Sequence, residues 1–129
     1  MSRWYVDTSA ALKLIVEETE SEALGQAIDS ARPELVASWL LETELRRAAQ
    51  RAPALSQELV SELLEMVSLY EVPGSLFREA GLLPGKGLRS LDALHLSAAI
   101  RIGTEHVVTY DARMGDSARE LGLSVLAPA

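Results

Sequence analysis

Short apolar runs alternate with longer helical patterns along the whole chain, and this alternation limits the fold more than any other feature. Apolar runs of strand length occur at residues 3–6, 35–38, 68–72, 106–110 and 124–126. Helical patterns fill the gaps between them, as in the βαβ units of a parallel sheet. We therefore expect an α/β fold with a central parallel sheet and helices on both of its faces.

Capping and helix-breaking residues predict where the helices begin and end. Pro53 stops one helix, and Gly103 and Gly122 are natural residues to follow two others. A short helix is expected after Pro73. The turn-rich segment Pro84 to Gly87 is expected to form a mobile loop, whose role the sequence leaves open. The longer helices are expected at residues 8–17, 20–30, 38–52, 56–67, 90–102 and 112–121.

Length and composition indicate one folded domain over residues 1–129, long enough to bury about two-thirds of the surface of its unfolded chain. The longest apolar stretches are too short to cross a bilayer, and the N-terminus lacks the pattern of an export signal. The absence of cysteine excludes disulfides, thiolate catalysis and cysteine-ligated zinc. We expect a soluble cytoplasmic protein with no membrane partner.

The net charge of −7 argues against the simplest kind of nucleic-acid binder, which carries a broad basic surface. It does not exclude a nuclease. Divalent cations held in an acidic pocket present positive charge locally, and a phosphate group responds to that local field.

Four acidic residues stand in or beside apolar segments, where an ionised carboxylate is costly unless a cation or good hydrogen-bond donors compensate it. They are Asp7, Glu44, Asp92 and Asp111. Asp7 and Asp111 close apolar strands, and parallel sheets bind ligands at the carboxyl ends of strands where the strand order reverses. If these two strands are neighbours, the two carboxylates converge. The pattern indicates a site for a metal ion that favours oxygen ligands.

Each of the four also has a purely structural explanation. Asp7 and Asp111 precede helices, where aspartate satisfies free backbone amides. Glu44 lies at the rim of its helix, where a glutamate is more often simply solvated. Asp92 lies in a first helical turn, where the helix dipole favours it. Its helix is apolar in nearly every direction, so we expect that helix to be packed on several sides, and Asp92 is the hardest to explain without a metal.

Other polar residues near these four are candidates for outer contacts to the site or to a substrate. For the hydroxyl groups the alternative is capping or turn formation, and for the arginines it is a solvated surface. For His95 we prefer a packed core histidine with hydrogen bonds, because a carboxylate site selects hard cations; any function of His95 stays open. The candidates are Thr8, Ser9, Thr109, Asp116, Arg89 and Arg113.

Four short motifs follow one another along the chain, at residues 5–10 (YVDTSA), 43–48 (TELRRA), 88–96 (LRSLDALHL) and 108–111 (VTYD). With these motifs in this order, the chain resembles the PIN domains and, within them, the VapC-like toxins, over essentially its whole length. The resemblance implies a three-layer fold with four or five parallel strands in the order 3-2-1-4-5. It places the family's acidic set on Asp7, Glu44, Asp92 and Asp111, whereas Asp116 matches poorly.

The same resemblance implies an endoribonuclease that depends on Mg²⁺ or Mn²⁺, in which these four residues bind metal and carry catalysis. It further implies the toxin of a type II toxin–antitoxin system, inhibited by a VapB-like antitoxin. Such toxins are usually homodimers that form hetero-oligomers with the antitoxin and bind operator DNA only through it.

Two alternatives remain. One is a catalytically degenerate PIN fold that acts as a protein-binding module; the filled acidic positions make it less favoured. The other is a phosphotransfer domain with an acidic pocket. A haloacid-dehalogenase-like phosphatase needs an Asp-x-Asp-x-Thr pattern, but Asp7 is followed by Thr8 and Ser9. A receiver domain needs a second acidic residue near the first and a lysine after a late strand, and neither is present.

Overall fold

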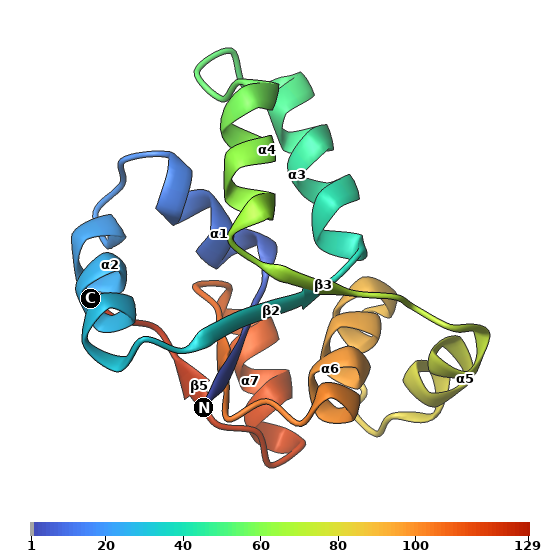
Figure 1. The fold of residues 1–129 in the computed structure, drawn as a ribbon. Helices are drawn as coiled ribbons and strands as arrows, with labels where there is room; N and C mark the ends of the chain where they lie inside the picture. Colours follow the sequence, from blue (N-terminus) through green and yellow to red (C-terminus); the bar gives the residue numbers. More distant parts are fainter. Residues whose placement is uncertain (1) are drawn as a thin grey trace.

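The computed structural model describes residues 2–129, which form a five-stranded parallel sheet with helices between the strands (Figure 1). The strands are β1 (Arg3–Val6), β2 (Glu34–Ser38), β3 (Ser68–Tyr70), β4 (His106–Val108) and β5 (Val125–Leu126). The helices are α1 (Thr8–Ile15), α2 (Ser21–Ala31), α3 (Leu40–Arg51), α4 (Gln57–Glu65), α5 (Gly74–Leu82), α6 (Ser90–Ile102) and α7 (Ala112–Glu120).

The strand order is β3-β2-β1-β4-β5, as the resemblance implied. β1 is therefore central: Tyr5 lies opposite Val36 of β2 on one side and Val107 of β4 on the other. All four strand pairs are parallel. This order differs from the 2-1-3-4-5 order of receiver domains, so the structure does not support the receiver alternative.

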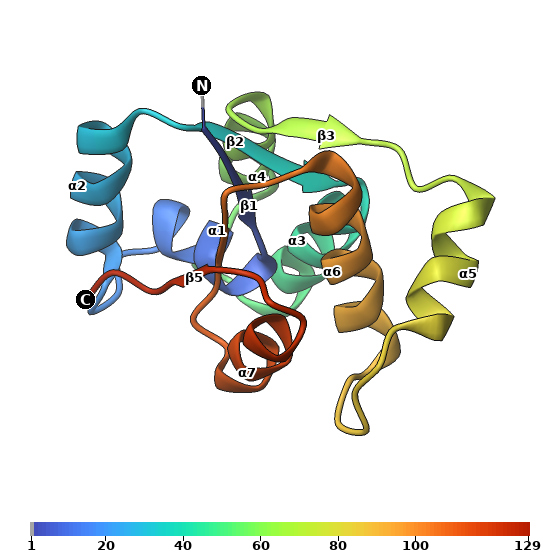
Figure 2. The ribbon, with the colours of Figure 1, turned by 90° about the horizontal axis from the view of Figure 1, so that it is seen from below.

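Helices cover both faces of the sheet, as expected for three layers. α3 and α4 lie on one side of the sheet, and α6 and α7 lie on the other (Figures 1 and 2). α1 packs against α2, α3 and α4, and α5 packs along α6. Within residues 2–129, no helix combines the length and the apolar character needed to cross a membrane.

Some predicted boundaries were wrong by a few residues. The apolar run 106–110 is too long, since β4 ends at Val108. Beyond it, the backbone N–H of Tyr110 donates to the Ser9 hydroxyl at 2.9 Å instead of to a neighbouring strand. Ser38 was expected both to end the strand run 35–38 and to begin a helix; it ends β2, where it pairs with Tyr70, and α3 begins only at Leu40.

α6 is packed on several sides, as its sequence predicted, and is exposed mainly near its two ends. Ala93 and residues 95–99 are buried, but the side chains of Leu91 and Ile100 are 51% and 45% exposed. α5 and β2 contact α6. The Pro84–Gly87 segment connects α5 to α6 as an exposed loop that projects away from the sheet (Figure 2).

Leu96 of α6 is fully buried in the core, whereas Leu82 at the end of α5 is 78% exposed. We expect Leu96→Ala to lower the free energy of unfolding by about 2–5 kcal/mol, because it removes apolar contacts and leaves a cavity. Leu82→Ala is the matched control and should change it by less than about 0.5 kcal/mol. Urea denaturation followed by circular dichroism measures both values. Equal losses in the two variants would contradict the described packing.

Candidate active site

The ends of the three central strands meet at one edge of the sheet. Asp7 directly follows β1, Thr109 directly follows β4, and Ser38 is the last residue of β2. The three remaining acidic residues come from helices. Glu44 lies in the second turn of α3, Asp92 in the first turn of α6, and Asp111 caps α7.

Three of these four carboxylates line one pocket. It is bordered by Glu44, Asp92 and Asp111, by two arginines, and by Ser90 and Leu91. Residues from α3, α6 and α7 thus converge although they are distant in sequence. Asp7 does not line this pocket and is only 6% exposed.

The Asp7 carboxylate is held by donors on several sides. Its Oδ1 accepts the backbone N–H of Ala10 at 2.9 Å and the Ser9 hydroxyl at 2.7 Å. Its Oδ2 accepts the Thr109 hydroxyl at 2.5 Å. Burial nevertheless raises the pKa of Asp7, because desolvation outweighs these hydrogen bonds. Asp7 is therefore an N-cap, as the structural explanation required, and also a buried carboxylate beside the site.

Glu44 is fixed through one oxygen. Oε1 accepts the Thr8 hydroxyl at 2.8 Å and lies 2.6 Å from Nε2 of His95. Burial acts to raise the pKa of Glu44, but the hydrogen bonds from His95 and Thr8, together with the charge of the imidazole when protonated, bring it below its usual value. Glu44 is thus kept ionised at a half-buried position.

Asp92 and Asp111 face the pocket with less support. Partial burial, followed by the negative charges of Asp111 and Glu44, raises the pKa of Asp92. Asp111 is exposed, and its Oδ1 accepts the backbone N–H of Met114 at 3.1 Å, the capping role that the sequence allowed. These carboxylates repel one another because negative charge is concentrated at the pocket. A bound cation would reduce that repulsion.

The hydroxyl candidates all contact the acidic set, since Thr8 binds Glu44 while Ser9 and Thr109 bind Asp7. The Thr109 hydroxyl oxygen also accepts the backbone N–H of Asp111 at 3.1 Å. This single side chain therefore connects the carboxylate after β1 with the start of α7.

Of the charged candidates, Arg89 and Arg113 line the pocket. Asp116 does not; it borders a separate surface depression and lies 3.6 Å from Arg119. The structure gives Asp116 no contact with the four site carboxylates, in line with its poor match to the family pattern.

His95 is a packed, hydrogen-bonded core histidine, as preferred from the sequence: it is 2% exposed. The contact between His95 and Glu44 was not predicted. Nδ1 lies 2.7 Å from the Tyr5 hydroxyl, which also accepts the backbone N–H of Ser38 at 3.3 Å. Spacing gives a partial signal, because Tyr5 is two residues before Asp7 on a strand and His95 is three residues after Asp92 on a helix.

The donor types at the pocket fit a hard divalent cation. Carboxylate oxygens suit Mg²⁺, which keeps several waters and needs only one or two carboxylates. Within residues 2–129, however, no three His, Cys, Asp or Glu side chains are grouped closely enough to hold a metal ion together. Asp92, Asp111 and Glu44 are the pocket residues that could hold one, and Asp7 retains an unused acceptor position on Oδ2.

The raised pKa of Asp7 predicts a pH-dependent effect of Asp7→Asn. The amide of Asn can accept from Ala10 and donate to Thr109, so the local hydrogen bonds survive. A raised folded-state pKa means that the wild type loses stability as pH rises through that value. In chelator, we expect the variant to be at least as stable as wild type at pH 8. Its advantage should shrink as the pH falls towards the unfolded-state value.

Thermal unfolding from pH 4 to pH 8 measures this difference. A variant less stable than wild type at pH 8 and equally stable in acid would show instead that ionised Asp7 stabilises the metal-free fold.

Comparison with known proteins agrees with the geometry. The family model described as PIN domain matches residues 4–120. A curated relative, Ribonuclease VapC35 of Mycobacterium tuberculosis, is 38% identical over 96% of this chain and 96% of its own.

Two solved structures share the fold at low sequence identity. The toxin-antitoxin complex from Klebsiella pneumoniae contains a chain with TM-score 0.75 and 16% identity, covering 97% of both chains. VapBC2 from Rickettsia felis, bound to a DNA fragment from its promoter, gives TM-score 0.71 and 13% identity, covering 98% of this chain and 99% of the other. By its family model and its relatives, this chain belongs to the PIN domain family, among the VapC-like proteins.

Proposed function

We propose that this protein is a divalent-metal-dependent endoribonuclease and acts as the toxin of a VapBC-like toxin–antitoxin pair. The observation that carries the proposal is the pocket in which Glu44, Asp92 and Asp111 converge from three helices. The relative named Ribonuclease VapC35, similar over nearly the whole chain, supports RNA as the substrate. We propose a cytoplasmic location as well, where the enzyme would meet cellular RNA.

The acidic residues would hold Mg²⁺ or Mn²⁺. When bound, such an ion would supply Lewis-acid stabilisation of charge on a phosphodiester and lower the pKa of a nearby water. The protein's own contribution is to keep the carboxylates in place. Asp7 is fixed by Ser9 and Thr109, and Glu44 is fixed by Thr8 and His95.

Arg89 and Arg113 give the pocket a binding role for anions. Both border it together with the carboxylates, so a phosphate group beside them meets positive charge. Arginine binds phosphate oxygens through charge-assisted hydrogen bonds that position the substrate. These two residues explain how an acidic protein can bind RNA without a broad basic surface.

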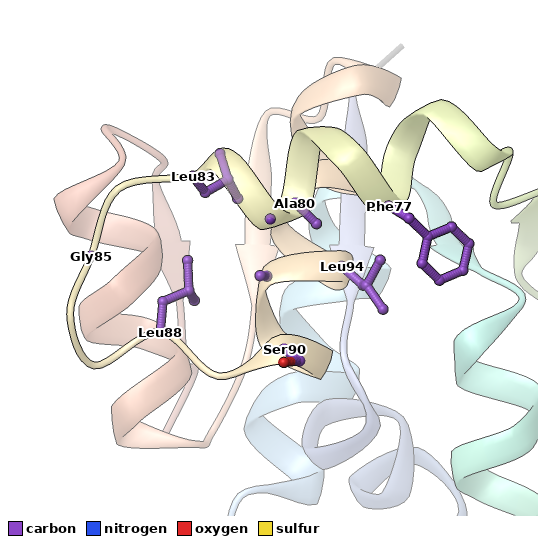
Figure 3. A pocket seen from close by; sticks show the side chains of 9 residues that line it. Phe77, Ala80, Leu83, Gly85, Leu88, Ser90 and Leu94 are labelled. Carbon is purple, nitrogen blue, oxygen red and sulfur yellow. The ribbon is translucent and has the colours of Figure 1, made fainter.

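A VapB-like antitoxin is the proposed partner, and a groove beside the pocket, lined mainly by apolar residue types, supports a protein-binding surface. The groove lies between α5, the following loop and the start of α6 (Figure 3). Phe77, Leu82 and Leu91 are large exposed apolar residues in this region. Ser90 borders both the groove and the acidic pocket, so one bound segment could reach both.

We further propose that the toxin forms a homodimer and, with the antitoxin, a hetero-oligomer that binds operator DNA through the antitoxin. The solved VapBC2 assembly, bound to a DNA fragment from its promoter, supports DNA binding by a toxin–antitoxin complex of this kind. The charge of −7 fits it as well, because an acidic toxin is a poor DNA-binding surface on its own.

The central test is cleavage of RNA in Mg²⁺ or Mn²⁺ by wild type, Asp7→Asn, Asp92→Asn and Asp111→Asn. We expect each variant to lose about 100-fold or more in kcat/KM, because even residues that only support metal ligands are worth about 10- to 100-fold. Asp29→Asn, at an exposed site on α2, is the control and should cleave like wild type. Chelator should abolish cleavage in every sample.

Equal RNA cleavage in all these samples would refute the nuclease assignment. The binding-module alternative predicts a different pattern, with no cleavage by wild type and no rise in melting temperature when metal is added.

The arginine role is tested by Arg113→Gln against the control Arg47→Gln, which is exposed on α3 and does not border the pocket. A hydrogen bond to a charged group is worth roughly 1.5–3 kcal/mol, so we expect Arg113→Gln to raise KM for RNA about 10-fold or more. Initial rates at varied RNA concentration separate KM from kcat. A similar rise in both variants would assign the effect to net charge.

A further inference from the structure

Glu44 is held on its buried side by a series of hydrogen-bonded polar side chains. These side chains come from three other elements. His95 of α6 contacts Glu44 at 2.6 Å, Tyr5 of β1 contacts His95 at 2.7 Å, and Ser38 of β2 contacts Tyr5 at 3.2 Å. We propose that His95 is a positioning residue that orients the Glu44 carboxylate as a ligand for a divalent ion. This inference rests on the proposed metal-dependent function of the pocket.

The direction of the hydrogen bond to Glu44 follows from the groups involved. An ionised carboxylate only accepts hydrogen bonds, so Nε2 of His95 must carry the hydrogen that points to Oε1. In neutral imidazole, Nδ1 is then an acceptor, and the Tyr5 hydroxyl lies 2.7 Å away, placed to donate its one hydrogen to it. With that hydrogen directed to Nδ1, the contact of 3.2 Å between the Tyr5 and Ser38 hydroxyls requires the Ser38 hydroxyl to be the donor. Tyr5 thereby selects the tautomer that presents a donor to Glu44.

The phenol can fill this role because it stays protonated and fixed. Tyr5 is fully buried, and burial raises its pKa far above the usual value. Its oxygen accepts the backbone N–H of Ser38 at 3.3 Å, which ties the ring to β2. The Tyr5 and His95 rings also meet edge to face, with centroids 5.8 Å apart. Rotation of the imidazole would break contacts on both of its nitrogens.

These contacts give the two carboxylate oxygens of Glu44 different roles. Both the Thr8 and the His95 hydrogen bonds go to Oε1. Among residues 2–129, no side-chain or backbone group is hydrogen-bonded to Oε2 in the structure. Because Glu44 lines the pocket, Oε2 is the atom left for an ion. A glutamate fixed in this way avoids the loss of rotamer freedom that an unsupported side chain would incur on binding.

Two amide substitutions separate the donor to Glu44 from the contact to Tyr5. The amide nitrogen of glutamine is as many bonds from Cα as Nε2 of histidine, whereas that of asparagine corresponds to Nδ1. His95→Gln therefore keeps a donor within reach of Glu44. His95→Asn keeps a polar group facing Tyr5 but ends short of Glu44. Both replace imidazole by a neutral amide, so each serves as the matched control for the other.

The direct readout is the dissociation constant for Mn²⁺, measured by calorimetry without RNA. We expect His95→Asn to weaken Mn²⁺ binding about 10- to 100-fold, the range found for groups that support metal ligands, and His95→Gln to stay near wild type. The kcat for RNA cleavage should follow the same order, with KM for RNA little changed. Unfolding measurements confirm that the compared samples are folded.

A double-mutant cycle tests whether His95 acts through Glu44. With Glu44→Gln already present, His95→Asn should weaken Mn²⁺ binding little further, because the group to be oriented has been altered. Independent, additive losses would overturn the inference. The inference would also be overturned if His95→Asn bound Mn²⁺ as tightly as wild type. The same holds if His95→Asn and His95→Gln lost Mn²⁺ affinity equally.

These results are distinguishable from failure of the proposed nuclease. A wild-type protein that binds Mn²⁺ but leaves RNA intact would refute the nuclease, while the Mn²⁺ affinities of the two amide variants would still decide the role of His95. A wild-type protein that binds no Mn²⁺ would overturn the inference itself.

Discussion

The buried carboxylate at the end of the central strand is the constraint on which the rest of the site depends. Asp7 can remain there only if donors reach it, and they come from the start of α1 and from Thr109 after β4. β4 must therefore lie beside β1, which the strand order provides. The same Thr109 hydroxyl accepts the backbone N–H of Asp111 and so sets where α7 begins. The site therefore depends on the sheet topology, because the pairing of β1 with β4 brings the Thr109 hydroxyl to the Asp7 carboxylate.

Above this buried layer, the pocket residues have few fixed partners. Thr8 and His95 each hydrogen-bond Glu44, and Tyr5 supports His95. In contrast, Asp111 is exposed, and partial burial and acidic neighbours raise the pKa of Asp92. A divalent ion and a positively charged side chain would be attracted to the same carboxylates that line the pocket.

Much of this arrangement could be predicted from the sequence, and the failures have identifiable causes. Strand runs, helix caps and the switch-point rule located Asp7 and Asp111, and the resemblance supplied the strand order.

The contact between Tyr5 and His95 joins residues 90 positions apart, and no local pattern encodes it. The end of β4 depends on a hydroxyl of Ser9, 101 positions from the amide it binds. The packing of α6 on several sides was predicted, whereas the exposure of Leu91 and Ile100 near its ends depends on which neighbouring elements reach them. The role of the Pro84–Gly87 loop stays open.

The central place of β1 has a consequence for the order of assembly. β1 leaves the ribosome before one of its two neighbours, β4, which begins only at His106. Until that segment emerges, Asp7 lacks the Thr109 hydroxyl and the pocket lacks Asp111. Contacts between distant parts of a chain form late, because the intervening chain must first be closed into a loop. A copy of this chain that ends before Thr109 and Asp111 therefore carries no complete pocket.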